Sequence, residues 1–234
     1  MKHYSIALVS DVPQLTLEAL TPVTHALQVQ ANKHFAPLWG IRATVEAHTE
    51  KDIPPGFWPI RIQANIGDPS AAGFHTDANN QPYAVVQYAP GWEITASHEL
   101  LEMLFDPFGN ALTPAVVNGK HVMVLQELCD PCEGFTYQTN GVPFSDFLTP
   151  HYYERAAFAS GEHYSFLDKL SGPMAVGVDG YLSYLDLETN HWMQETNFAG
   201  QGIVVSDLGP NDKAARGGMS LREWISQVSK IERA

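Results

Sequence analysis

The segment from Thr95 to Pro107 (TASHELLEMLFDP) constrains the fold most, because it combines a helical apolar pattern with a strip of ionisable side chains. At about 100° per residue, the apolar side chains share one arc that would face a core. This arc holds Ile94, Leu101, Leu104 and Phe105, with Leu100 at its edge. The neighbouring arc holds Thr95, His98, Glu99, Glu102 and Asp106. The sequence predicts a helix from Trp92 to about Phe105 that ends at Asp106-Pro107, since proline disfavours a helical preceding residue.

The polar strip of this predicted helix has the composition of a metal site. His98 and Glu102 are one turn apart, so both can reach a single cation. Glu99 lies about 100° from His98 around the axis, where it could approach a water molecule without ligating the metal. Without a cation, three half-buried carboxylates would repel one another, and one would tend to take up a proton. The alternative is an ordinary His98–Glu102 pair at a helix surface, with Glu99 a solvated carboxylate; such a pair contributes about 0.2–0.5 kcal/mol.

The N-terminal half alternates between strand-like and helix-like patterns. We expect strands at 4–10, 41–48, 59–66 and 83–88. We also expect a helix that starts at Thr21-Pro22, stops at Pro37 and buries Leu20, Val23, Leu27, Ala31 and Phe35. The Gly-, Asp- and Asn-rich segment 67–81 is predicted to be a loop. Its His75-Thr76-Asp77 is interpreted as a polar turn, with a contact to a substrate or to a second cation as the alternative.

The C-terminal half is less regular. A strand is expected at 122–128, and turn residues at 139–141 and 188–190 predict two hairpins. Ser220 to Glu223 forms a capping box that opens a C-terminal helix. A single CxxC, Cys129 to Cys132, indicates a tight turn with two buried thiols. The sequence thus predicts an α+β protein, with a mixed twisted sheet and the active-site helix in residues 1–110 and a loop- and hairpin-rich subdomain in residues 111–234.

Five residues of the predicted helix carry a resemblance to a known family. His98-Glu99-Leu100-Leu101-Glu102 resembles the HExxH helix of zincin metallopeptidases, with Glu102 in place of the second histidine. The order strand, long helix, strand, strand, loop, strand and HE-containing helix is similar to the zincin N-terminal subdomain, over about residues 1–110. Ser97 to Leu100, through Asp106-Pro107, also resembles a SHEL…E…DP signature of bacterial and plant secreted proteins.

The resemblance implies a zincin-like fold and a metal-dependent hydrolase, in particular a peptidase with one Zn²⁺ or another divalent metal. His98 and Glu102 would be ligands, and Glu99 would be the general base that activates water for attack on a peptide or amide carbonyl. The third ligand is left open between Asp106 and Glu127, with Asp130 ranked below them. The second subdomain would form the other wall of the cleft.

The resemblance also implies where a substrate would bind. In zincins, the strand just before the active-site helix is the edge strand that pairs with an extended substrate. Residues 83–88 occupy that place in this chain. Tyr83 and Val85 are therefore the predicted substrate-binding residues.

The glutamate at position 102 departs from the family pattern. Its extra negative charge would make the metal a weaker Lewis acid and would suit a harder cation than zinc. The alternative function is therefore a catalytically inactive, zincin-derived module that binds metal or a protein partner.

Composition limits the binding partners and the cellular location that we expect. Thirteen Lys and Arg against 26 Asp and Glu give a net charge of −13, which argues against nucleic acid as a partner. A membrane-spanning helix needs about 20 apolar residues, and no apolar run in the sequence approaches this length, so no membrane partner is expected. The short apolar run Ile6 to Val9 is too short for a signal peptide core, so we expect a soluble cytoplasmic protein. The oligomeric state is not predicted.

Overall fold

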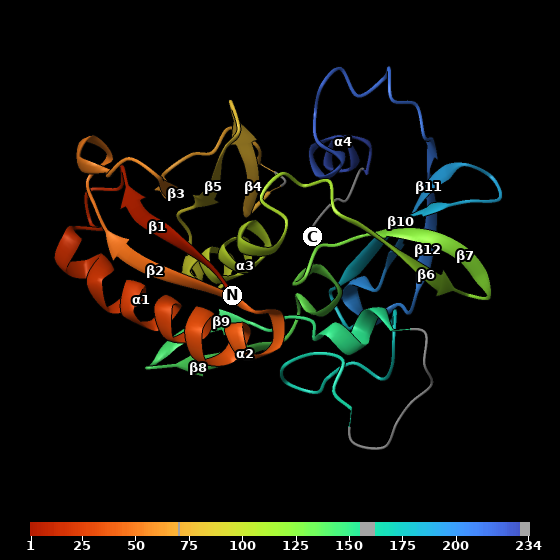
Figure 1. Cartoon of the computed structure of the whole chain (residues 1–234), viewed down its shortest axis with the longest axis horizontal. Helices are drawn as coiled ribbons and strands as arrows, with labels where there is room; N and C mark the ends of the chain where they lie inside the picture. Colours follow the sequence, from red (N-terminus) through yellow and green to blue (C-terminus); the bar gives the residue numbers. More distant parts are fainter. Residues whose placement is uncertain (70, 155–161, 230–234) are drawn as a thin grey trace. The chain divides into compact units, whose positions relative to one another are not determined.

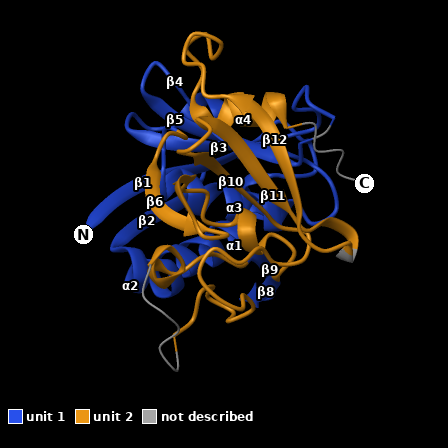
Figure 2. Ribbon diagram, turned by 90° about the vertical axis from the view of Figure 1, so that its right-hand side faces the viewer, with its two compact units in different colours: residues 1–108, 136–145 blue, residues 109–135, 146–234 orange. Residues whose placement is uncertain are grey.

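The computed structural model describes residues 1–69, 71–154 and 162–229. The chain forms an α+β fold of two compact units, coloured separately in Figure 2. The first unit comprises residues 1–108 and 136–145, and the second comprises residues 109–135 and 146–234. The change of unit after Phe108 lies close to the boundary expected at 110. Residues 136–145, which the sequence groups with the C-terminal half, belong to the first unit.

A five-stranded mixed sheet forms the centre of the first unit, in the order β2-β1-β3-β5-β4 (Figure 1). Its strands are β1 (Lys2–Ser10), β2 (Ile41–Ala47), β3 (Phe57–Gln63), β4 (Gly73–Ala78) and β5 (Gln81–Gln87). The pairs β1–β2, β1–β3 and β3–β5 are parallel, whereas β4 runs antiparallel to β5. Parallel strands buried on both faces explain the nearly continuous apolar run in β1, from Ile6 to Val9.

Strand β4 corrects two predictions. Segment 67–81 is not all loop, because residues 73–78 pair with β5 through the two-residue turn Asn79-Asn80. Both asparagines have positive φ, 54° and 62°, as a type I′ hairpin turn requires. Strand β5 is consequently an interior strand between β3 and β4, and the expectation that 83–88 forms the edge of the sheet is wrong. The edge strand on this side of the sheet is β4, which pairs with β5.

The first helical region is longer than predicted. Helix α1 (Leu17–Val29) begins after Thr16, whose side chain accepts a hydrogen bond from the Ala19 N–H, so Thr21-Pro22 is inside the helix rather than at its start. The π-helical turn η1 (Gln30–Phe35) and α2 (Ala36–Trp39) continue it past Pro37, until Gly40 ends it with a φ of 71°. The five apolar residues predicted to face the core are all buried.

Helix α3 (Trp92–Phe105) has the predicted bounds and lies against β5, β4 and β3 (Figure 1). The hairpin of β8 (Thr136–Thr139) and β9 (Val142–Ser145) also packs on α3. Ser97 fixes this contact, because its hydroxyl donates to the Ile94 carbonyl and accepts from the Ser145 N–H at 2.8 Å. Helix α3 is therefore held between the sheet and this hairpin.

The second unit contains an antiparallel sheet in the order β12-β11-β10-β7-β6. Its strands are β6 (Leu112–Val117), β7 (Lys120–Leu125), β10 (Tyr181–Asp186), β11 (His191–Thr196) and β12 (Val204–Pro210). The predicted hairpins at 139–141 and 188–190 are confirmed, whereas β6 and β12 were not predicted. Helix α4 (Leu221–Val228) starts with the predicted Ser220–Glu223 capping box, and its Trp224 packs near Trp192 of β11.

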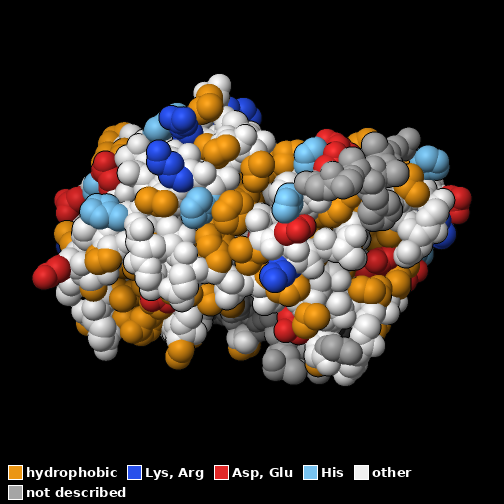
Figure 3. Space-filling view, turned by 90° about the horizontal axis from the view of Figure 1, so that it is seen from below, with side chains coloured by type: hydrophobic (Ala, Val, Ile, Leu, Met, Phe, Trp, Pro, Cys, Tyr) orange, Lys and Arg blue, Asp and Glu red, His pale blue; other side chains and the backbone are white. Residues whose placement is uncertain are grey.

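In the part of the chain that the structure describes, no helix combines the length and the hydropathy needed to cross a bilayer. On the face drawn in Figure 3, charged side chains are interspersed with hydrophobic ones and the described Lys and Arg side chains are few. This scarcity agrees with the excess of acidic over basic residues in the sequence.

Candidate metal centre

The candidate site is built on α3, and its polar strip is buried as fully as its apolar face. His98, Glu99 and Glu102 are 7%, 3% and 0% exposed. The interpretation of His98 and Glu102 as a solvent-exposed helix pair therefore does not fit. Buried carboxylates require compensation from hydrogen bonds or a positive charge, because moving an ion out of water is costly.

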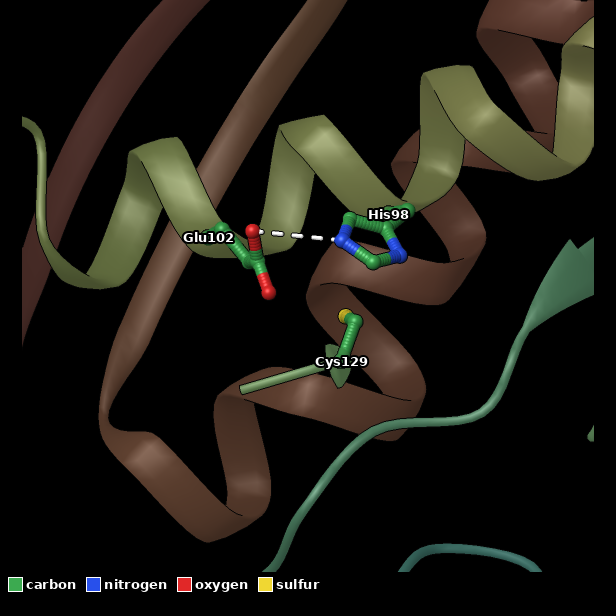
Figure 4. A group of neighbouring side chains, drawn as sticks. All are labelled: His98, Glu102 and Cys129. Carbon is green, nitrogen blue, oxygen red and sulfur yellow. Dashed lines mark ion pairs between the residues drawn. The ribbon is translucent and has the colours of Figure 1, made fainter. Parts of the chain in front are cut away.

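His98 and Glu102 face one another across one helical turn (Figure 4). His98 Nε2 lies 3.2 Å from Glu102 Oε2. Two ligand atoms that are each about 2.0–2.1 Å from a tetrahedral zinc ion are about 3.3–3.4 Å apart. The imidazole nitrogen and the carboxylate oxygen therefore have both the chemistry and the spacing of two ligands to one cation.

His75 brings a second imidazole to the same carboxylates from strand β4. Its Nδ1 is 3.3 Å from Glu99 Oε2 and 3.7 Å from Glu102 Oε2, and its Nε2 is 3.1 Å from the Asp106 carbonyl oxygen. The His75 side chain is 0% exposed. The interpretation of His75-Thr76-Asp77 as a polar turn is wrong, because these residues form a strand. The Asn79-Asn80 turn signature was the sequence signal that could have revealed it.

Gly73, on the same strand, allows α3 to approach β4 closely. A Cβ atom at this position would lie 2.7 Å from Thr95 Cγ2, 2.9 Å from the Val85 carbonyl oxygen and 3.2 Å from Glu99 Oε1. The first two distances are shorter than real Cβ contacts. The absence of a side chain at Gly73 thus sets the distance between β4 and the Glu99 carboxylate.

The three candidates for a third ligand lie in different parts of the chain. Asp106 is the C-cap of α3 and is 5% exposed; its N–H donates to the Glu102 carbonyl at 2.7 Å. Glu127 and Asp130 belong to the second unit and are 5% and 2% exposed. There, Glu127 Oε2 lies 3.4 Å from Nε of the buried Arg222. The third ligand stays a prediction among these three residues.

Tyr83 and Val85, the predicted substrate-binding residues, are on the interior strand β5. Val85 pairs with Arg61 of β3 on one side and with Phe74 of β4 on the other. From Ala84 to Val86, the backbone of β5 is therefore already paired in the sheet on both sides. Pairing of β5 with an extended peptide, the role expected of these residues, is excluded by this arrangement.

A different group of possible ligands lies on the second unit. His151 Nδ1 is 3.0 Å from Glu154 Oε2 and 3.9 Å from Glu162 Oε1, and these side chains are 42%, 50% and 30% exposed. Exposed ion pairs of this kind contribute little to stability and form without any metal. His151 is therefore a suitable control residue for the buried His98.

The predicted CxxC turn is confirmed. Cys129 and Cys132 are free, buried cysteines, and a short 3₁₀ turn, η3 (Asp130–Cys132), contains the second of them. Comparison of the chain with protein-family models, with curated proteins and with solved structures found no match.

Proposed function

We propose that this protein is a metal-dependent hydrolase of the zincin type, acting on peptide bonds. The observation that carries the proposal is the buried His98–Glu102 pair, with donor atoms 3.2 Å apart, beside the buried Glu99 on the same helix. Three buried acidic residues, Glu99, Glu102 and Asp106, belong to α3 or to its C-cap, and the imidazoles of His75 and His98 lie 3.7 and 3.2 Å from Glu102 Oε2. A divalent cation would offset the accumulated negative charge.

The residues present fit zinc or a harder divalent ion. His98 Nε2 and Glu102 Oε2 would hold it, with Asp106, Glu127 or Asp130 as a further ligand. When bound, such an ion acts as a Lewis acid that makes water more acidic and polarises a carbonyl group. The carboxylate at position 102 adds negative charge to the ligand set and moderates this acidity.

Glu99 is the proposed general base. Its carboxylate is held between two features of strand β4, with Oε2 next to His75 Nδ1 and Oε1 facing the space at Gly73. A carboxylate fixed on a buried helix loses little orientational freedom when it accepts a proton from the attacking water. The same carboxyl group can then return that proton to the leaving amine.

The free edge of β4 is the proposed docking site for the substrate. Among the described strands, none pairs with the side of β4 that faces away from β5. An extended peptide added there would hydrogen-bond to the backbone of residues 73–78 and would lie beside Glu99. This edge replaces Tyr83 and Val85 in the proposal.

Glu99→Gln tests this function, with Glu93→Gln in the first turn of the same helix as the matched control. We expect Glu99→Gln to reduce cleavage of a broad peptide library by about 10²–10⁴-fold while the protein keeps its metal. Glu93→Gln should cleave like wild type. Cleavage by Glu99→Gln at the wild-type rate would contradict the assignment. A wild-type protein that holds metal and cleaves nothing would instead support the non-catalytic metal-binding alternative.

A further inference from the structure

Strand β12 forms an open, apolar edge of the sheet in the second unit. It pairs with β11 on one side, and no other strand in the described part of the chain pairs with it. Ile203, just before the strand, and Val204 and Val205 within it are 48%, 49% and 47% exposed. Successive side chains of a strand point to opposite faces, so apolar side chains are exposed on both faces of this edge. Such an edge is a template for pairing with another chain.

Two other outer strands are protected against such pairing. At β2, Asn32 Nδ2 donates to the Ala43 carbonyl at 2.6 Å, and Asn32 Oδ1 accepts from the Ala43 N–H at 3.3 Å. Further along β2, Gln28 Oε1 accepts from the Val45 N–H at 3.0 Å. Strand β6, at the opposite edge of the sheet that contains β12, carries Pro114, which has no N–H to donate. These devices are absent from the first half of β12.

The second half of β12 is protected in a similar way. The register between β11 and β12 shifts between Trp192 and Met193, and the strand ends at Pro210. Asp207 adds a charge, which lies 2.9 Å from His191 Nδ1. Shifts in register, prolines and charges all oppose edge-to-edge pairing. The open part of the edge is therefore the uncharged segment 201–206, QGIVVS.

The charge of this segment indicates which chain can pair with it. A basic peptide would need carboxylates along the edge, but segment 201–206 has none, and the carboxylate of Asp207 is engaged by His191. A second copy of the protein presents the same uncharged, apolar segment. The edge is therefore complementary to itself rather than to a charged partner.

The register of self-pairing follows from the positions of the apolar residues. Antiparallel pairing centred on Val204 places this residue opposite its own copy and places Ile203 opposite Val205. Pairs of β-branched side chains on neighbouring strands are favourable, and like charges opposite one another are not. In this register Asp207 lies opposite Gln201, so no like charges face each other.

We propose that β12 is a dimerisation edge, at which two copies of this chain pair antiparallel through segment 201–206. A short pairing of this kind gives a weak dimer that forms and dissociates with concentration. The net charge of −13 on each copy opposes association, and salt screens this repulsion. The dimer should therefore become tighter as the salt concentration rises. The proposal does not depend on the metal site.

Sedimentation velocity of the whole chain, over a range of protein concentrations at low and high salt, tests the proposal. Val204→Lys places two like charges opposite each other at the centre of the pairing, and we expect it to weaken the dimer by about 10-fold or more. Val116→Lys is the matched control, because Val116 is a 39% exposed valine of β6 and the change in charge is the same. Val116→Lys should associate like wild type, and thermal unfolding checks that each variant is folded.

A mixture of two variants tests the symmetry of the pairing. Val204→Lys alone and Val204→Glu alone should both dissociate, whereas an equimolar mixture should dimerise, because lysine then faces glutamate across the edge.

Four results would overturn the proposal. These are a wild type that stays monomeric at every concentration, a dimer that Val204→Lys does not weaken or that Val116→Lys weakens equally, a mixture that stays monomeric, and a wild-type dimer that dissociates as salt is added.

Discussion

The buried carboxylate of Asp146, in the second unit, should make the free energy of unfolding depend on pH. Asp146 is 0% exposed, and its Oδ1 accepts hydrogen bonds from the N–H groups of Phe147 at 2.8 Å and Leu167 at 3.0 Å. Burial raises the pKa of Asp146 from 3.8 to about 6, although hydrogen bonds from Ser165 and from backbone N–H groups oppose the increase. Asp146→Asn keeps the shape and the accepting oxygen and removes the charge.

The pH dependence of stability depends on the difference between the folded and unfolded pKa of Asp146. Because the pKa is higher in the folded protein, Asp146 contributes stability that is fully present below pH 3.8 and is lost as the pH rises through about 6. One pKa unit corresponds to about 1.4 kcal/mol, so ionised Asp146 opposes folding by at most about 3 kcal/mol at pH 8. Asp146→Asn should therefore match wild type near pH 4 and exceed its stability by up to about 3 kcal/mol at pH 8.

Urea unfolding at pH 4 and pH 8 measures this difference. Asp186→Asn is the matched control of opposite sign, because a hydrogen bond from Lys120 lowers the pKa of Asp186 in the folded protein. Its contribution is present above pH 3.8 and is lost as the pH falls through its lower folded pKa, so Asp186→Asn should destabilise the protein at pH 8. A stability difference between Asp146→Asn and wild type that does not change with pH would refute the reasoning.

Two further predictions concern the candidate site. Gly73→Ala should lower the free energy of unfolding by about 1–3 kcal/mol and weaken Zn²⁺ binding, because the new Cβ would overlap Thr95 and the Val85 carbonyl; unchanged urea unfolding would contradict the close approach. Asp106→Asn and Glu127→Gln test the third ligand by titration with Zn²⁺. The substitution that removes this ligand should weaken Zn²⁺ binding by about 10–100-fold or more. Wild-type affinity in both variants would exclude Asp106 and Glu127 as ligands.

The helix of the candidate site could be predicted from the sequence because its signals are local. Periodic apolar residues, Gly91 before the first turn and Asp106-Pro107 at the end determine α3 without reference to the rest of the chain. The five buried positions of the first helical region were predicted for the same reason. The start of this helix was predicted incorrectly, because Thr21-Pro22 has the sequence pattern of a helix N-terminus whereas Thr16 is the actual N-cap.

The strand that completes the site could not be predicted from composition. Residues 73–78 lie in a segment rich in Gly, Asp and Asn, and they form a strand because β5 supplies its hydrogen-bonding partners. Overlooking β4 displaced the predicted edge of the sheet to β5 and left His75 in a loop. Burial of the polar strip of α3 likewise depends on packing, since the sequence pattern alone is equally compatible with a solvated face.

Elemental analysis of purified wild type beside His98→Ala tests the account most directly, with His151→Ala as the control for an exposed histidine between two carboxylates. We expect one equivalent of a divalent metal in wild type and in His151→Ala, and none in His98→Ala. Wild-type protein purified without chelators that contains no metal, or His98→Ala that retains the wild-type amount, would contradict it.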